Sequence, residues 1–573
     1  MKINDVERIT GLTQKAIRLY ESKGLISIVR DENGYRNYTD EDIVTFKTIK
    51  LLRSVGLSIA DIKLYIFGVV DIGEIMDKRK SEILKESGIN SEKYRICEDI
   101  SKGIDLDRSR DTEILTENEE INSTEHGSLS VGVDIGTTTI SAVVYDIDHK
   151  EQLEAYTVPH HSYVCCDTFS EQSTSVITEK AEKLLSHIMK CYTNIVSIGL
   201  SGQMHGIVYI DSDGNPISNL INWQDKRADQ PIAEGKTACE LIRIITGKQI
   251  STGYGIATHY YNLQKGLVPE KAVGFCSIMD LFGMKICGLK KAVTHTSVAA
   301  SFGLLDIKKG EFLLDKLSLL GIDGRFLPSV TAESRVIGSY EGIPVTVALG
   351  DNQASFLGAV SEDRDSILVN IGTGSQISAV SEYCEHDSDI ELRPFIDGKY
   401  LVCGSALCGG YAYSMVENFF RSYMVSAGMQ DVSQYKTINR LALDAYQKGE
   451  KGLDVDVSFF GKRSDPDKRG SVNAIDRENF TPERLVLGVL CGMCNELYEL
   501  YEGFEEKKPN IVASGGGVRR NPVLKKLIED RFGLPVSVNA TKEEAATGVA
   551  LFSAYVVGRI GYDNGFSEYI SYV

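Results

Sequence analysis

Two segments of the chain place an acidic or amide side chain, a glycine and several hydroxyls in the same order. Asp134-Ile-Gly136-Thr-Thr-Thr follows an apolar run, and so does Asn370-Ile-Gly372-Thr-Gly-Ser. Each pattern predicts a buried strand, a tight turn at the glycine and a second strand. The hydroxyls and N–H groups of such a turn suit an anion such as phosphate. Two ordinary hairpins are the alternative, but a pattern that recurs far along the chain indicates two duplicated lobes.

A third segment joins a predicted strand to a predicted helix. Residues 345–349 form a β-branched run, Gly350-Asp351-Asn352-Gln353 follows, and ASFLGAV begins a helical pattern. Asp351 could cap this helix, as aspartate often does. It could equally lie at the floor of a ligand cleft, where its carboxylate is available for chemistry.

Two further segments carry polar side chains beside glycine or an aromatic ring. The loop Ser201-Gly-Gln203-Met204-His205-Gly follows the predicted strand 195–200, and ligands of α/β sheets bind at such strand ends. His205 is either a ligand contact or a satisfied core histidine. Trp223, the only tryptophan, either packs in the core or offers a ligand an apolar face beside the polar groups of NWQDKR.

A glycine cluster, Ser514-Gly515-Gly516-Gly517, follows a predicted strand at 511–513 and precedes a helix expected to begin near Asn521. Glycines allow close backbone approach, and a helix N-terminus favours negative charge. With DIGTTT at 134–139 and GDNQASFLGA at 350–359, this cluster resembles the FGGY family of carbohydrate kinases over about residues 128–573. GQMHG and NWQDKR are most similar to its sedoheptulose and xylulose kinases.

The resemblance implies an α/β fold with two actin-like (ribonuclease H-like) lobes and an interlobe cleft. The N-terminal lobe, residues 128–344, would bind sugar and phosphate, and the C-terminal lobe, 345–573, would supply the catalytic base and bind the nucleotide. The implied activity is ATP-dependent phosphorylation of a primary hydroxyl of a sedoheptulose- or xylulose-like ketose. Many family members have Lys or Arg where this chain has Ser141, and many have Asp in the segment that is Thr294-His295-Thr296-Ser297 here.

The resemblance also implies roles for individual residues. Asp351 would be the catalytic base, and Asp134 would hold Mg²⁺ through water. The expected substrate-binding residues are Gln203, Met204, His205, Trp223, Asp225, Asp351 and Asn352. The expected ATP- and phosphate-binding residues are Gly136, Thr137, Thr138, Thr139, Gly372, Thr373, Gly374, Gly515, Gly516, Gly517 and Asn521.

The first seventy residues have a different pattern. A short helical run at 3–9 is broken by Gly11, Thr13 is a plausible N-cap for a second helix, and NGYRNYT forms a turn before a further capped helix. This succession resembles the MerR family, which implies a small all-α winged helix-turn-helix domain over residues 1–70. The residues expected to face duplex DNA, mostly at phosphate, are Thr13, Arg18, Tyr20, Tyr35, Arg36 and Tyr38. A degenerate domain used for protein contact is the alternative.

Charge and composition separate this N-terminal part from the rest. The net charge is −18, whereas residues 1–69 carry 11 Lys and Arg against 9 Asp and Glu. Residues 71–104 are charged and helical with a break at Gly88, so they could form a short dimerisation segment. Residues 105–127 are polar and predict a linker. The twelve scattered cysteines, with the single CxxC inside an apolar helical run, and the lack of an apolar segment long enough for a membrane predict a cytoplasmic protein.

Two functions therefore remain open. The first is an active ketose kinase fused to a DNA-binding domain, which Asp134, His205 and Asp351 favour. The second is a transcription regulator whose kinase-like part senses sugar or nucleotide with little turnover, which Ser141 and the N-terminal domain favour.

Overall fold

The computed structural model describes residues 1–26, 28–30, 36–87, 92–101, 126–166, 169–383, 390–462, 465 and 467–573. The chain divides into two compact units. The first comprises residues 1–127 together with 182–194, and the second comprises residues 128–181 and 195–573. Within the described residues, no helix is long and apolar enough to cross a membrane.

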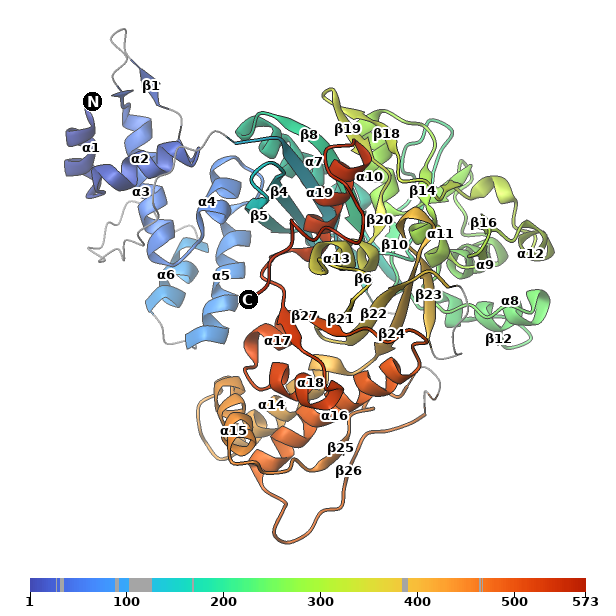
Figure 1. The fold of residues 1–573 in the computed structure, drawn as a ribbon. Helices are drawn as coiled ribbons and strands as arrows, with labels where there is room; N and C mark the ends of the chain where they lie inside the picture. The colour runs from blue at the N-terminus through green and yellow to red at the C-terminus, as the bar shows by residue number, and fades with distance from the viewer. Residues whose placement is uncertain are drawn as a thin grey trace. The chain divides into compact units, whose positions relative to one another are not determined.

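The first unit is built mainly of short helices, and hydroxyl side chains cap the starts of several of them (Figure 1). Thr13 accepts a hydrogen bond from the Ala16 N–H at the start of α2, and Thr39 forms a capping box with Asp42 at the start of α3. Gly11 ends α1 in the left-handed conformation, with φ of 66°. These caps confirm the predicted helix-turn-helix and the capped helix that follows it.

The described residues of 1–127 contain six helices and the two strands of the predicted wing. They are α1 (Ile3–Thr10), α2 (Gln14–Ser22), β1 (Val29–Arg30), β2 (Arg36–Asn37), α3 (Asp40–Ser54), α4 (Ile59–Ile66), α5 (Ile72–Ser87) and α6 (Glu92–Ser101). α5 and α6 pack against each other. The predicted break at Gly88, residues 102–104 of the predicted helical segment and residues 105–125 of the predicted linker lie outside the described residues.

The first large sheet of the second unit has the strand order β18-β19-β8-β3-β4-β5, and β20 also pairs with β8. β3 and β4 form the hairpin predicted from DIGTTT, and β3 runs parallel to β8 on its other side. In this register Asp134 lies opposite Ser141 of β4 and Ser201 of β8. The strands are β3 (Leu129–Ile135), β4 (Thr139–Asp146), β5 (Glu151–Pro159), β8 (Ile195–Gly202), β18 (Val336–Tyr340), β19 (Ile343–Thr346) and β20 (Leu349–Gly350).

The second large sheet has the order β23-β24-β22-β21-β27-β28 and repeats the same plan. β21 and β22 form the second predicted hairpin, and β21 runs parallel to β27 on its other side. The strands are β21 (Ser366–Ile371), β22 (Ser375–Ser381), β23 (Glu391–Pro394), β24 (Tyr400–Ala406), β27 (Asn510–Ser514) and β28 (Val536–Val538). The repeat inferred from the two glycine-threonine segments is therefore a repeat of sheet topology.

Two helices, α13 (Asp351–Ala359) and α19 (Glu544–Val556), pack closely on each other and lie side by side in Figure 1. α19 also lies on β3, β4 and β8 of the first sheet. A Cβ at Gly548 would lie 1.9 Å from the Ala354 carbonyl oxygen, and one at Gly132 would lie 1.8 Å from that of Ala546. Only glycine allows backbones to approach so closely.

A buried polar contact fixes α19 on the first sheet. The Ser130 hydroxyl on β3 donates to the Ala550 carbonyl at 2.6 Å, across 420 residues of sequence, and shares hydrogen bonds with Ser197 and Ser553. The last long helix of the chain therefore belongs to the core of the first sheet. The predicted lobe boundary between residues 344 and 345 needs correction, because it divides β19, and the first sheet continues to Gly350.

The second sheet is covered on both faces. Leu368, Val380 and Cys403 face the core that contains α13 and α19. Val369 and Ile377 face the opposite core with α14, α15 and α16. Cys494, from the CxxC segment of α16, is buried in that opposite core, as predicted.

The remaining elements connect and flank the two sheets. They are β6 (Tyr163–Cys166), β7 (Ser170–Gln172), α7 (Thr174–Cys191), β9 (Val208–Ile210), β10 (Leu220–Ile221), β11 (Pro231–Ala233), β12 (Lys236–Thr237), α8 (Ala238–Thr246), α9 (Gly255–Lys265), β13 (Gly274–Cys276), α10 (Ile278–Cys287), β14 (Val293–His295), α11 (Thr296–Phe302), β15 (Leu305–Asp306), β16 (Glu311–Phe312), α12 (Leu314–Leu319), β17 (Ser329–Thr331), α14 (Gly409–Ser426), α15 (Tyr435–Gln447), β25 (Asp454–Asp456), β26 (Ser471–Asn473), α16 (Pro482–Glu502), α17 (Gly516–Arg520) and α18 (Leu524–Phe532).

Candidate active site

The first glycine-threonine turn is held from several directions. The Gly136 N–H closes the turn on the Thr139 carbonyl at 2.9 Å. The side chains of His160 and Gln203 both donate to the Gly136 carbonyl, at 3.2 and 3.3 Å, and Gln172 donates to the Thr137 carbonyl at 2.7 Å. These side chains fix the carbonyl groups of the turn, while the hydroxyl-bearing residues 137–139 keep some exposure to solvent.

The second turn is held by the start of α14. The Gly410 N–H donates to the Gly372 carbonyl at 3.0 Å, and the Tyr411 N–H donates to that of Thr373 at 2.9 Å. A Cβ at Gly409 would lie 2.4 Å from the Gly374 carbonyl carbon, so glycine is required for this approach. Residues 372–374 are exposed, which leaves the turn accessible to a ligand.

Asp351 is the first residue of α13 but does not cap it. Gly350 is the N-cap residue, and no side chain accepts a capping hydrogen bond there. Asp351 Oδ1 instead accepts a hydrogen bond from Asn352 Nδ2 at 2.9 Å, and the Gly350 N–H donates to Ser297 Oγ at 3.3 Å. The carboxylate is therefore left for a role other than capping.

The two predicted acidic residues both have raised pKa values, and Asp351 acts on Asp134. Burial raises the pKa of Asp134 to about 7, and the negative charge of Asp351 adds to the rise. Burial also raises the pKa of Asp351, whereas the positive charge of Arg393 lowers it. The end of β3 and the start of α13 therefore bring two carboxyl groups into one site.

Asp134 has the properties of a ligand for a hard cation. Its Oδ1 atom is buried and has no hydrogen-bond partner among the described residues. Carboxylate oxygen suits Mg²⁺, which usually takes one or two protein carboxylates together with water and phosphate oxygens. The described residues contain no group of three or more His, Cys, Asp or Glu side chains that could bind a metal, so a site completed by phosphate fits better than a closed protein site.

His205 is held in an uncommon conformation in the loop between β8 and β9. Its φ is 72°, its N–H donates to Ser301 Oγ at 3.0 Å, and its ring stacks on Tyr254 with centroids 4.4 Å apart. Nδ1 lies 2.9 Å from the Ser301 carbonyl oxygen. Because a carbonyl only accepts, Nδ1 carries the proton in this contact, and Nε2 of a neutral ring is a hydrogen-bond acceptor.

Four further residues were predicted to bind substrate: Gln203, Met204, Trp223 and Asn352. Trp223 is 46% exposed and donates through Nε1 to Thr137 Oγ1 at 3.0 Å, so its ring lies beside the first turn. The amide of Asn352 contacts the sulfur of Met204 at 3.7 Å, which brings that loop to the start of α13. Gln203 Oε1 is buried and has no hydrogen-bond partner in the described part of the chain.

Asp225, also predicted to bind substrate, is buried within the NWQDKR segment. It is 0% exposed, and its carboxylate accepts hydrogen bonds from the guanidinium of Arg227 and from the Ser170 N–H. A carboxylate that is enclosed and paired in this way stabilises the NWQDKR segment, and its direct contact with substrate stays a prediction.

The glycine cluster lies against the end of β21. Gly515 has φ of 89°, and a Cβ there would lie 2.6 Å from the Ile371 carbonyl oxygen, next to the second turn. The expected single helix near Asn521 is instead two helices, α17 from Gly516 and α18 from Leu524. Asn521 is 4% exposed, accepts a hydrogen bond from the Val523 N–H and donates one to Asn439 Oδ1. These bonds support the loop, and a direct contact of Asn521 with the nucleotide stays a prediction.

Comparison with known proteins agrees with this arrangement. Residues 129–358 match the N-terminal domain of the FGGY family of carbohydrate kinases, and residues 368–557 match its C-terminal domain. The chain belongs to the FGGY family of carbohydrate kinases. Residues 1–66 of this FGGY kinase match the MerR HTH family of regulatory proteins.

Curated relatives of the FGGY kinase align with about three quarters of the chain. Sedoheptulokinase of Mus musculus is 24% identical over 470 residues, which are 74% of this chain and 96% of the relative. Xylulose kinase of Staphylococcus xylosus is 23% identical over 457 residues, which are 74% of this chain and 90% of the relative.

Solved structures show the same fold. Ligand-bound xylulose kinase from Lactobacillus acidophilus has a TM-score of 0.66 at 20% identity, covering 78% of this chain and 93% of that one. Gluconate kinase from the same species has a TM-score of 0.67 at 20% identity with the same coverage. The expected two-lobed FGGY fold is confirmed.

The helix-turn-helix of the FGGY kinase presents only some of the residues predicted to face DNA. Thr13 and Arg18 are exposed. Tyr20 and Tyr38 are only 5% and 2% exposed, because both rings belong to the small core of this unit, and their contact with DNA stays a prediction. Arg36 Nε is 2.5 Å from Glu21 Oε2 in an ion pair, and Tyr35 lies outside the described residues.

Several residues near the site of the FGGY kinase were missed by sequence reasoning. His160 and Gln172 hold the first turn, Tyr254 and Ser301 hold His205, and Arg393 acts on Asp351. All five lie outside the glycine-rich and strand-end patterns that carry the sequence argument. Their positions follow from tertiary packing, so no local signal could have found them.

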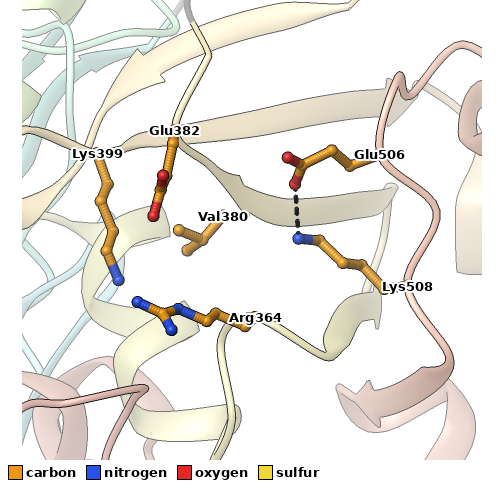
Figure 2. A pocket seen from close by; sticks show the side chains of 6 residues that line it. All are labelled: Arg364, Val380, Glu382, Lys399, Glu506 and Lys508. Carbon is orange, nitrogen blue, oxygen red and sulfur yellow. Dashed lines mark hydrogen bonds and ion pairs between the residues drawn. The ribbon is translucent and has the colours of Figure 1, made fainter.

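A cavity of about 260 Å³ lies away from these residues in the FGGY kinase. Figure 2 shows its lining, which includes Val380 near the end of β22 distant from the second turn. Lys508 pairs with Glu506, Lys399 pairs with Asp363, and Glu382 also lines the space. Arg364 also lines the space, so three basic side chains are balanced by Glu382, Glu506 and Asp363, and the cavity does not favour an anionic ligand.

Proposed function

We propose that this carbohydrate kinase transfers the γ-phosphoryl group of ATP to a primary hydroxyl of a ketose of the xylulose or sedoheptulose type. The observation that carries the proposal is the convergence of Asp134 and Asp351 with the His205 loop and the first glycine-threonine turn. Relatives named as sedoheptulokinase and xylulose kinase support the choice of a ketose.

In this proposal Asp351 is the catalytic base. Its carboxylate takes the proton of the sugar hydroxyl as that oxygen attacks the γ-phosphorus, and the bond from the γ-phosphorus to the bridging oxygen of ADP breaks. Asp134 would hold Mg²⁺, which when bound offsets the negative charge of the phosphates. Thr137 to Thr139, residues 372–374 and the glycines of 515–517 would contact the nucleotide.

The sugar would lie between the loop 203–205 and the ring of Trp223. His205 Nε2 and Gln203 Oε1 can each accept a hydrogen bond from a hydroxyl, while the exposed ring of Trp223 offers a surface for C–H groups. Such a combination of an apolar face and fixed polar groups is what a polyhydroxylated ligand requires.

The test is ADP release measured with a panel of xylulose, ribulose, sedoheptulose, glycerol and gluconate. We expect the highest kcat/KM for one of the ketoses and loss of turnover without Mg²⁺. Turnover with glycerol or gluconate but with none of the ketoses would overturn the substrate assignment, while ATP hydrolysis without any acceptor would overturn the transfer itself.

A second candidate function rests on the match of residues 1–66 to MerR regulatory proteins. In this alternative the chain is a cytoplasmic transcription regulator whose kinase part senses sugar or nucleotide. Residues 1–70 would bind duplex DNA, α5 and α6 within residues 71–104 would form a homodimer, and residues 105–127 would be the linker. Sugar binding with no measurable turnover across the panel would favour this alternative.

A further inference from the structure

Phosphoryl transfer in this site needs a positive charge that the two turns do not provide. The segments 134–141 and 370–377 contain no Lys or Arg, and Ser141 beside Asp134 is an uncharged buried hydroxyl. Asp134 and Asp351 are both acidic. A phosphoryl group passing between ATP and sugar carries negative charge on its oxygens, so an additional cation nearby would stabilise the transition state.

Arg393 is placed to supply this charge. It lies on β23, the edge strand of the second sheet, directly before Pro394. The Gln353 side chain donates to the Pro394 carbonyl at 2.9 Å and so fixes β23 against α13, two residues after Asp351. Arg393 also lies close enough to Asp351 to affect it, because its positive charge lowers the pKa of Asp351 against the effect of burial.

The hydrogen bonding of Arg393 is incomplete on one side. Its Nε and Nη2 atoms donate to Glu391 Oε2 at 3.1 and 2.5 Å, which fixes the plane of the guanidinium. Its Nη1 atom is buried without a hydrogen-bond partner among the described residues, and the side chain is only 13% exposed. A buried charged donor left unpaired is costly, so such a donor next to a reactive carboxylate indicates a ligand.

We propose that Arg393 is a further catalytic residue, whose Nη1 group donates hydrogen bonds to the phosphoryl group while it passes from ATP to the sugar hydroxyl. This inference rests on the proposed function. In the transfer, the bond between the γ-phosphorus and ADP breaks, the bond to the sugar oxygen forms, and Asp351 receives the hydroxyl proton. Arg393 keeps its own protons and only stabilises charge.

The phosphoryl group is a better occupant than an acidic group of the sugar. Asp351 takes the proton of the reacting hydroxyl, so the space beside Asp351 holds the reacting end of the sugar. A sugar carboxylate would lie at the far end of the molecule from the primary hydroxyl. The geometry therefore assigns Arg393 to the reaction and leaves sugar recognition to the loop 203–205.

The test compares Arg393→Gln and Arg393→Lys with wild type in the full chain. Loss of one transition-state donor typically lowers kcat about 10²–10³-fold, and we expect this for Arg393→Gln with little change in either KM. Arg393→Lys should recover part of the loss. Arg484→Gln is the matched control, because Arg484 also forms an arginine–glutamate pair, with Glu450 at 3.1 Å, but on α16 across the second sheet.

Two further measurements keep the result unambiguous. The first is the thermal midpoint of each variant, which shows whether it is folded. If Arg393→Gln is unfolded, a tenfold or greater loss of kcat in a folded Arg393→Lys supports the proposal. The second measurement is the ratio of kcat between wild type and Arg393→Gln as a function of pH. Direct contact with the phosphoryl group predicts a defect that persists at high pH, whereas a defect that disappears there would overturn direct contact and leave an effect through Asp351 alone.

Asp351→Asn in the same assay separates this inference from the proposed function. An active wild type, an inactive Asp351→Asn and an unimpaired Arg393→Gln would overturn only the role of Arg393. A change confined to the KM for the sugar would also overturn it. A wild type without turnover on any acceptor would overturn the proposed function and this inference together.

Discussion

Asp351 shows how position decides the role of a single side chain. An aspartate at the start of a helix is ordinarily read as a cap, yet here Gly350 occupies the N-cap position and no side chain caps the helix. The carboxylate instead lies near Asp134 and Arg393, and its pKa responds to Arg393. Its surroundings are those of a reactive group.

The first prediction concerns this base. Asp351→Asn keeps the size of the side chain but cannot accept the hydroxyl proton, so we expect kcat to fall about 10²–10⁴-fold. Nucleotide affinity should stay within a few-fold of wild type, because no contact with the turns is removed. Steady-state ADP release and a nucleotide-binding titration measure the two quantities. A variant that turns over at the wild-type rate would refute the assignment.

The second prediction concerns His259, a buried histidine of α9. It is 2% exposed, its Nδ1 is 3.0 Å from the Tyr209 hydroxyl, and its ring stacks on Phe326. Burial lowers its pKa from 6.5 to about 4. The free energy of unfolding is therefore unaffected by this histidine above pH 6.5 and decreases as the pH falls from 6.5 toward 4. In that range the unfolded chain takes up a proton that the buried ring does not.

His259→Gln should remove part of this pH dependence. Between pH 7 and pH 5 the single histidine accounts for a loss of about 2 kcal/mol in the free energy of unfolding. Urea unfolding of wild type and variant at both pH values measures it. His295, whose pKa burial also lowers to about 4, continues to contribute in the variant. Identical losses in the two proteins would contradict the prediction.

At the scale of elements, the crossing of α13 and α19 depends on a close approach of the two backbones. Gly548→Ala would place a methyl group 1.9 Å from the Ala354 carbonyl oxygen, so the helices must separate. Overpacking of this kind typically costs about 1–3 kcal/mol. We expect a lower thermal midpoint than for Gly561→Ala, where nothing lies within 4 Å of the added Cβ. Equal midpoints would show that the two helices can move apart freely.

The fourth prediction concerns α2, the second helix of the helix-turn-helix. Arg18 is exposed on α2, whereas Arg36 already forms an ion pair with Glu21. If this helix contacts DNA phosphate, Arg18→Ala should weaken duplex binding and reduce the slope of log affinity against log salt by about 1. Fluorescence anisotropy at several salt concentrations measures both. Arg477→Ala, an exposed arginine of the kinase unit, is the control.

Across the whole molecule, local patterns predicted more of the fold than of the site. The two glycine-threonine hairpins, the caps at Thr13 and Thr39, and the strand before Asp351 were predictable because each depends on a few adjacent residues. The burial of Tyr20 was not predictable, because an aromatic ring at a helix end suits either DNA or a core.

The same distinction applies within the site. Asp225 was expected to contact the ligand from its sequence context alone, and its hydrogen bonds to Arg227 and Ser170 appear only in the folded structure. Arg393 carries no local signal, since its significance depends on β23 lying against α13. Sequence patterns therefore predicted the strand ends and turns. The positions of the charged side chains around them depend on packing between distant segments and could not be predicted.

The contact between Ser130 and Ala550 has a consequence for the order in which the protein is made. The two residues are 420 positions apart, and α19 covers β3, β4 and β8 from the C-terminal end of the chain. At about 5–20 residues per second, a ribosome needs about 20 to 80 s to reach α19 after β3. During that time this face of the first sheet lacks its native cover, so the earliest part of the kinase to be synthesised is among the last to be completed.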